Sequence, residues 1–291
     1  MHAHVAQLER YGLDFLKVMN DNPYPHAGRI EHVEDLATLS PLRGDEEGFG
    51  LQLELISSLK AGVEDRVYLP TTLFNAWMVL RLLVEPAKVY MPPNLDAEAD
   101  GPSRWIRQAY AYKPELVSAA MTTIGQNLAR FAGKCLQAGA DGVFLSVRDD
   151  WVDVPQAPEL HLYDHLVRPA DREILAAVNT AKFNILHVCG KAVDFKAFAG
   201  YPVPVMHWAD RAAGPAITDV APWLKPTLCG GVDNLGTLVS GSPEQVREEV
   251  LDAVRQAGSR PIIIAPGCTF DPQRVSEANL QAMVHVVRAL G

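Results

Sequence analysis

The sequence alternates between short apolar runs and longer amphipathic stretches along most of its 291 residues. This alternation is typical of repeated strand–helix units around a parallel sheet. The apolar runs are rich in Val, Ile, Leu and Phe, as expected for strands that are covered on both faces. They predict seven strands, at residues 14–19, 66–69, 141–147, 183–188, 203–208, 227–230 and 261–265. The amphipathic stretches predict helices, at residues 46–61, 114–138, 171–180, 243–258 and 276–290.

The length and the repeated units favour a single α/β domain over residues 1–291, folded as a (β/α)8 TIM barrel. Hydrophobic residues make up 48% of the chain, which is enough for a large core. A closed barrel of this type has eight strands, one more than the sequence shows. Either a further strand lies within residues 89–105, or the first unit is atypical or shortened, and we favour the second.

Two helices carry more detailed expectations. Five apolar residues predict a rough helical stripe on the first helix: Leu51, Leu53, Leu55, Ile56 and Leu59. Before the helix at 243–258, Ser242 is a suitable N-cap, Pro243 suits the next position, and Gln245 suits the third as a capping-box partner.

The composition limits the class of function and the compartment. A formal net charge of -9 disfavours a general nucleic-acid or anionic-membrane binder. We find no uncharged apolar run of the roughly 18 residues that a membrane span needs, and no signal-peptide pattern. Four cysteines in a chain of this length do not suggest a disulfide scaffold, so we expect a reducing cytoplasm.

Polar side chains follow most of the predicted strands. In a β/α barrel the carboxyl ends of all strands meet on one rim, where active sites are built. We therefore expect these residues to converge: Lys17, Asn20, Arg148, Asp149, Asp150, His187, Cys189, His207, Asp210, Asp233, Asn234 and Cys268.

A histidine and two cysteines among them have the spacing of a metal site. His187-Val188-Cys189 closes one apolar run, and Cys268 follows another after Pro266-Gly267. One imidazole and two thiolates make three sides of a tetrahedral zinc site and leave a fourth position open, which is the catalytic pattern. The alternative is a core histidine with two buried thiols. We interpret Cys135 and Cys229 as core residues and His207 as a packing or hydrogen-bonding residue.

The motif His187-Val188-Cys189-Gly190 with Pro266-Gly267-Cys268 resembles the His-X-Cys…Cys motif of zinc methyltransferases in the uroporphyrinogen decarboxylase superfamily. That branch includes methylcobalamin:coenzyme M methyltransferases. Further stretches are similar to the early, middle and late strands of the superfamily barrel: residues 11–19, 137–144, 231–233 and 243–246. The resemblance covers most of the chain.

The resemblance implies that His187, Cys189 and Cys268 hold Zn²⁺, which activates an acceptor thiol. It implies a methyl or alkyl transferase, with a corrinoid such as methylcobalamin as the methyl donor, usually on a separate small protein. The substrates would be a small thiol or a methylated small molecule. Lys17, Asp149 and Asp233 are our candidate catalytic residues. The two carboxylates could orient a ligand histidine, complete the metal shell or bind substrate. The alternative for each carboxylate is a loop or helix cap. The sequence does not decide the oligomeric state, and a homodimer is one possibility.

The chain departs from the decarboxylases of this superfamily, which carry an arginine-rich segment near their N-terminus that grips substrate carboxylates. No such segment occurs before the first predicted strand. A cofactor-free decarboxylase of a porphyrinogen-like acid stays an alternative, with Asp14 or Asp21 at the pyrrole nitrogens and Arg29, Arg148 or Arg211 at the carboxylates. A non-catalytic barrel that binds a corrinoid protein is a third hypothesis.

The early position of the first strand also leaves one sheet edge in need of cover. We expect residues 1–10, a nonstandard barrel or a partner chain to supply it.

Overall fold

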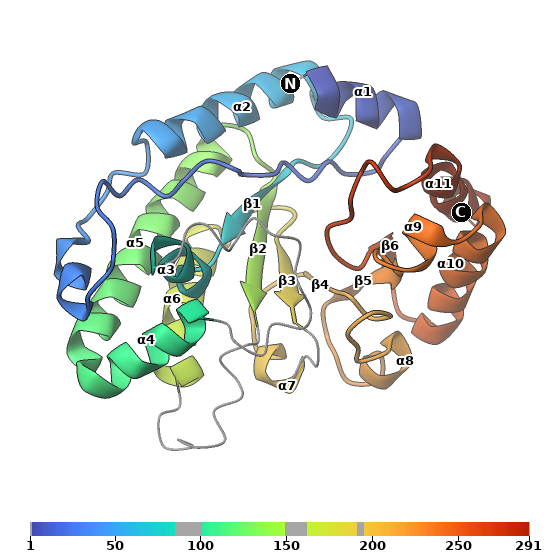
Figure 1. Cartoon of the computed structure of the whole chain (residues 1–291). Coiled ribbons are helices and arrows are strands. Elements are labelled where there is room, and N and C mark those ends of the chain that lie inside the picture. Colours follow the sequence, from blue (N-terminus) through green and yellow to red (C-terminus); the bar gives the residue numbers. More distant parts are fainter. Residues whose placement is uncertain (1, 85–100, 149–161, 191–194, 291) are drawn as a thin grey trace.

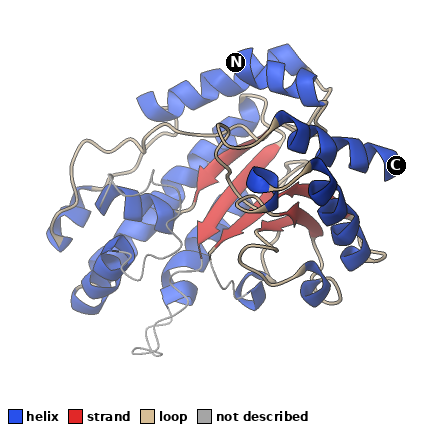
Figure 2. Ribbon diagram, turned by 45° about the vertical axis from the view of Figure 1, so that its right-hand side comes forward, coloured by secondary structure: helices blue, strands red, loops and turns tan. Residues whose placement is uncertain are grey.

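The computed structural model describes residues 2–84, 101–148, 162–190 and 195–290. Its centre is one sheet of six parallel strands, hydrogen-bonded in chain order, with helices packed around it (Figures 1 and 2). The strands are β1 (Pro70–Phe74), β2 (Gly142–Arg148), β3 (Ile185–Cys189), β4 (Val205–Trp208), β5 (Thr227–Val232) and β6 (Ile262–Pro266). A parallel sheet wound in chain order is the arrangement of a β/α barrel, which confirms the predicted fold class.

Strands β2 to β6 each overlap a predicted strand, with shifts of one to two residues at most of their ends. The exception is β1, because the prediction of 66–69 stops where β1 begins at Pro70. Proline lacks a backbone N–H but is tolerated as the first residue of a strand. The N–H of Leu69 donates to the Asp141 carboxylate at 3.0 Å, so this residue lies outside the ladder.

The predicted strand at 14–19 is an extended segment beside β1, held by two isolated parallel bridges, Phe15 to Tyr68 and Val18 to Thr71. Its N–H groups donate to carbonyl groups of the β1 side, with Val18 N 2.8 Å from Pro70 O. The segment therefore covers the β1 edge of the sheet without forming a regular strand. Of the stretch considered for a hidden strand, 101–105 is helical and the rest lies outside the described residues.

The five predicted helices are present, as α2 (Glu47–Val63), α5 (Pro114–Gln137), α6 (Arg168–Ala177), α10 (Pro243–Ala257) and α11 (Glu277–Leu290). The further helices are α1 (His2–Tyr11), α3 (Ala76–Val84), α4 (Gly101–Tyr112), α7 (Phe195–Phe198), α8 (Ile217–Val220) and α9 (Thr237–Ser240), with a 3-10 turn η1 (Val33–Thr38) and a π turn η4 (Tyr163–Val167).

The buried stripe of α2 differs from the prediction. It consists of residues spaced three or four apart: Phe49, Gln52, Ile56, Leu59 and Val63. Leu51, which we placed on the stripe, is 52% exposed. The polar Gln52 takes a buried position because its amide donates to Met19 O and to Thr71 Oγ1. Helix α2 thus ties the extended segment to β1.

The start of α10 is built as predicted. The Ser242 hydroxyl accepts from Gln245 N, and the Gln245 side chain accepts from Ser242 N, with Pro243 in the first turn. The two side chains satisfy two N–H groups that the first turn of a helix otherwise leaves unpaired.

Helix α1 packs against other helices. It packs on α2 and also contacts α11, where Arg10 forms an ion pair with Glu277 (Figure 1). The Arg288 side chain donates to Gly12 O just after α1. Helix α1 therefore joins α2 to α11, while the extended segment at 14–19 covers the sheet edge at β1.

Side chains alternate between the two faces of each strand, and this alternation separates two cores. On β3, Leu186 and Val188 face the helices, whereas Ile185 belongs to an inner cluster. The inner cluster contains Phe144, Ile185, Val205, Cys229 and Ala265, with Phe15 packed against it. By the same alternation His187 and His207 share the inner face with Ile185 and Val205, nearer the carboxyl ends of β3 and β4.

Candidate metal centre

Strand β3 places two of the three predicted metal ligands on one face. His187 and Cys189 are two residues apart, so both side chains point to the inner side of the sheet at its carboxyl end. His187 is 4% exposed, whereas Cys189 is partly exposed. A buried imidazole beside an accessible thiol therefore lines this end of the strand.

Cys268 arrives from the loop after β6 and completes the group. Its Sγ lies 3.4 Å from His187 Nε2, and the three potential ligand atoms all lie within 4.8 Å of one another. Zinc bond lengths of about 2.0–2.1 Å to nitrogen and 2.3 Å to sulfur, at tetrahedral angles, give ligand separations of about 3.5–3.8 Å. The donor set and its spacing therefore fit a zinc ion, and the three residues that the sequence singled out lie together.

The electrostatics distinguish this pair of cysteines from the other two. The hydrogen bond with Cys189 holds the pKa of the Cys268 thiol well below its usual range, supported by His187 and opposed by burial. Burial instead raises the pKa of Cys135 and Cys229, which are fully enclosed. Because the thiolate is the ligand and the nucleophile, only the first pair suits metal chemistry. The interpretation of Cys135 and Cys229 as core residues is confirmed.

Aromatic rings pack around His187. Its ring centroid is 5.3 Å from that of Phe144 and 4.7 Å from that of His207. Burial, and then the neighbouring His187, lower the pKa of His207 to about 3, so this ring is neutral. Its Nε2 lies 2.8 Å from Pro266 O, which makes Nε2 the protonated nitrogen. His207 is thus a hydrogen-bonding and packing residue, as expected.

The candidate catalytic residues have different surroundings. Lys17 projects from the extended segment with Nζ 4.9 Å from the Phe144 ring centroid, and burial lowers its pKa against the opposing effect of the Cys268 and Asp21 charges. Asp233 Oδ1 accepts from the N–H groups of Leu235 and Gly236 in its own turn. Asp149 lies outside the described residues.

Two contacts at this rim were not anticipated. Asn234 donates to Thr269 O at 2.8 Å, beside Cys268, and Asp210 accepts from Gly231 N at 2.7 Å. Burial raises the pKa of Asp210. Both residues follow strand ends, and this position indicated that they lie at the rim. It did not identify their partners, which lie 35 residues from Asn234 and 21 residues from Asp210 along the chain.

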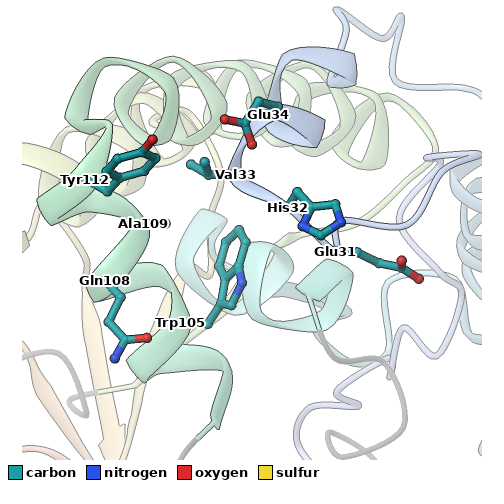
Figure 3. Close-up of a pocket in the computed structure, with 8 residues that line it drawn as sticks. All are labelled: Glu31, His32, Val33, Glu34, Trp105, Gln108, Ala109 and Tyr112. Atoms are coloured by element: carbon teal, nitrogen blue, oxygen red, sulfur yellow. The ribbon is translucent and has the colours of Figure 1, made fainter.

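A pocket of about 290 Å³ lies elsewhere, between η1 and α4 (Figure 3). Its lining residues are Glu31, His32, Val33, Glu34, Trp105, Gln108, Ala109 and Tyr112. None of them is a member of the candidate metal centre formed by His187, Cys189 and Cys268. In the described part of the chain, no helix combines the length and apolarity needed to cross a membrane.

Parallel strands wound in chain order, with an imidazole and two thiols gathered at their carboxyl ends, define a β/α-barrel protein with a candidate metal centre on its rim. The chain belongs to the uroporphyrinogen decarboxylase (URO-D) family, whose family model matches residues 4–290. It is therefore a member of an enzyme family, as the resemblance implied.

Solved structures of similar fold include a methyltransferase from Methanosarcina mazei. It is 16% identical in sequence, with a TM-score of 0.70 over 99% of this chain and 83% of that chain. A B12-independent methionine synthase from Shewanella sp. W3-18-1, in complex with selenomethionine, is 11% identical, with a TM-score of 0.52 over 82% of this chain and 67% of that chain. At these identities the likeness establishes the fold. No curated protein matches the chain by sequence.

Proposed function

We propose that this protein is a zinc-dependent transferase that moves a methyl or other alkyl group to a thiol. The observation that carries the proposal is the convergence of His187, Cys189 and Cys268 at the carboxyl ends of β3 and β6. Three protein ligands of this type leave one tetrahedral position for a substrate. The fold shared with a protein described as a methyltransferase supports the same reaction class.

The protein's own groups would prepare this reaction. Cys189 and Cys268 would hold a zinc ion as thiolates, and His187 would hold it as a neutral imidazole. A zinc ion held by them would supply one piece of chemistry, the deprotonation of an acceptor thiol at neutral pH. The barrel then has to hold the alkyl carbon in line with that sulfur.

Of the candidate catalytic residues, Lys17 is the one that faces this end of the sheet from a described segment, and we propose that it contacts substrate. Asp149 stays a candidate outside the described residues. The Asp233 carboxylate accepts hydrogen bonds from its own turn, so its proposed role is to shape the loop after β5.

The proposal extends to the methyl donor, the acceptor and the partner protein. We propose a corrinoid as methyl donor, carried on a separate protein, and a small thiol as acceptor, with a homodimer as the assembly to test. One solved structure of similar fold is described as B12-independent, so the donor is tested separately from the zinc site. Purified protein would be assayed for demethylation of methylcobalamin against a series of small thiols.

Metal analysis tests the zinc site directly. We expect wild-type protein from zinc-replete expression to hold about one zinc per chain, as a single site requires. Cys268→Ser should lose most of it, because a hydroxyl is a much poorer zinc ligand than a thiolate. Cys229→Ala is the matched control, since this cysteine lies on the same sheet outside the group. Wild-type protein without stoichiometric metal contradicts the proposal.

The family match makes decarboxylation of a porphyrinogen-like acid the competing function. One of its candidate carboxylate-binding residues is engaged internally, since Arg211 donates to Gly231 O and to Glu249 O. Incubation with uroporphyrinogen, followed by chromatography of the products, distinguishes the two functions. Decarboxylation retained in a Cys189→Ala, Cys268→Ala double variant would favour this alternative.

A further inference from the structure

The loop that carries Cys268 is anchored on its N-terminal side by β4. His207 Nε2–H donates to Pro266 O at 2.8 Å, two residues before the cysteine. The histidine is 5% exposed, and its other ring nitrogen has no hydrogen-bond partner among the described residues. The hydrogen bond to Pro266 O is therefore the one that satisfies a ring nitrogen of this buried histidine among the described residues.

The same loop is anchored on its C-terminal side by the segment after β5. Asn234 Nδ2 donates to Thr269 O at 2.8 Å, one residue after Cys268, and Asn234 is 2% exposed. Between the two anchors, Gly267 N donates to Val232 O at 3.0 Å. Buried hydrogen-bond donors thus fix the backbone on both sides of the cysteine.

His207 also contacts the other end of the candidate metal centre. Its ring centroid lies 4.7 Å from that of His187, and both rings pack against Phe144. Tilting of either histidine would change the separation between His187 Nε2 and Cys268 Sγ. His207 therefore contacts both the cysteine loop and the imidazole of His187.

We propose that His207 and Asn234 are positioning residues that hold Cys268 in ligating geometry, and we call the pair the Cys268 clamp. The inference rests on the proposed zinc site, because it concerns the geometry of one of that site's ligands. Groups that orient metal ligands typically change metal affinity by about 10–100-fold when they are removed. The clamp acts through hydrogen bonds to backbone carbonyls.

The test compares variants that remove or keep each hydrogen bond. His207→Phe keeps a ring beside His187 but has no donor, whereas His207→Gln can present an amide N–H near the position of Nε2. Asn234→Leu keeps the approximate shape and removes the donor. Asn279→Leu is the matched control, because Asn279 is also 2% exposed and donates to Leu238 O in α9 and to Gly241 O, outside the loop that carries Cys268.

Zinc affinity is measured by competition with a chelator, and the Co²⁺-substituted proteins are compared by their thiolate-to-cobalt absorption. We expect His207→Phe and Asn234→Leu to bind zinc about 10–100-fold more weakly. Their thiolate-to-cobalt band should be weaker as well. His207→Gln should recover most of the affinity. Asn279→Leu should lower the melting temperature as much as Asn234→Leu does, with unchanged zinc affinity.

The outcomes separate the two proposals. Wild-type protein that binds zinc, together with clamp variants of equal affinity and identical Co²⁺ spectra, overturns the clamp and leaves the zinc site standing. Equal loss in Asn234→Leu and Asn279→Leu also overturns it, because the effect would then be general destabilisation. Wild-type protein that binds no zinc overturns both.

Discussion

At the scale of single residues, the spacing of His187 and Cys189 matters because side chains two apart on a strand share one face. An odd spacing would direct one of the two into the helix-facing core, where Leu186 and Val188 lie. Their partner Cys268 depends on the backbone around it. A side chain at Gly267 would place its Cβ 2.6 Å from Ala209 Cα, which leaves no room for it.

We therefore expect Gly267→Ala to displace the Cys268 loop. The overpacking should lower the free energy of unfolding by about 1–3 kcal/mol and weaken zinc binding. Urea denaturation and chelator competition measure the two effects. Gly133→Ala is the control, since its Cβ meets nothing within 4 Å in helix α5 and should stabilise the helix. Unchanged zinc affinity in Gly267→Ala would contradict the expectation.

The proximity of His187, Cys189 and Cys268 could be predicted from sequence because each lies at or just after the end of an apolar run, and the topology of a parallel sheet brings such ends together. The contacts of His207 and Asn234 could not. His207 donates to a carbonyl oxygen 59 residues away along the chain, and Asn234 donates to one 35 residues away. The choice of acceptor is made by strand register and loop path, which short-range patterns do not encode.

At the scale of helices and strands, local signals predict best where they satisfy backbone groups directly. The capping box at Ser242 is an example, because serine and glutamine side chains meet the first N–H groups of α10. The stripe on α2 was right at Ile56 and Leu59 and wrong at the exposed Leu51, because leucines occur on several faces of this helix and only tertiary contacts decide which face is buried. Gln52 shows this, since its place in the core depends on Met19 and Thr71.

Removal of the cap gives a test at this scale. Ser242→Ala should lower the free energy of unfolding by about 1 kcal/mol, because the N–H of Gln245 loses its acceptor. Thermal and urea denaturation measure the change. Ser58→Ala, at an exposed position inside α2, is the control and should be neutral or slightly stabilising. A loss in Ser242→Ala no larger than in the control contradicts the assignment of the cap.

At the scale of the whole molecule, a buried carboxyl group joins three distant elements. Asp171 on α6 is fully buried and accepts from Asn75 Nδ2, just before α3, at 3.0 Å and from Tyr201 OH, ahead of β4, at 2.7 Å. Burial raises its pKa to about 7, and the two hydrogen bonds oppose the shift. In the unfolded chain the same group titrates near 3.8.

Because the folded pKa lies above the unfolded value, the folded state retains a proton that the unfolded state has lost. This contribution to stability is fully present below about pH 4 and is lost as the pH rises through about 7. The shift corresponds to an effect on the order of 4 kcal/mol. Relative to Asp171→Asn, the free energy of unfolding of the wild type should fall over this range in urea titrations. Parallel pH profiles of the two proteins would exclude this role for Asp171.

The sequence predicts a closed barrel of eight strands, and the described residues contain six strands in one sheet, wound in chain order. Hydrophobic runs locate strands that are buried on both faces, and β2 to β5 are largely of this kind, whereas β6 is only partly buried. The segment around Phe15 and Val18 has the same composition, yet it makes two bridges beside β1. Whether an extended segment becomes a regular strand depends on the neighbours available along its length, which composition does not report.

The division of the four sulfur atoms has a practical consequence. Two of them are sealed inside the packed interior, and two open towards the mouth of the barrel. A thiol reagent applied to the native protein will react first with Cys189 and Cys268. A fluorescent or spin label introduced in this way will report on that rim, without engineering any residue.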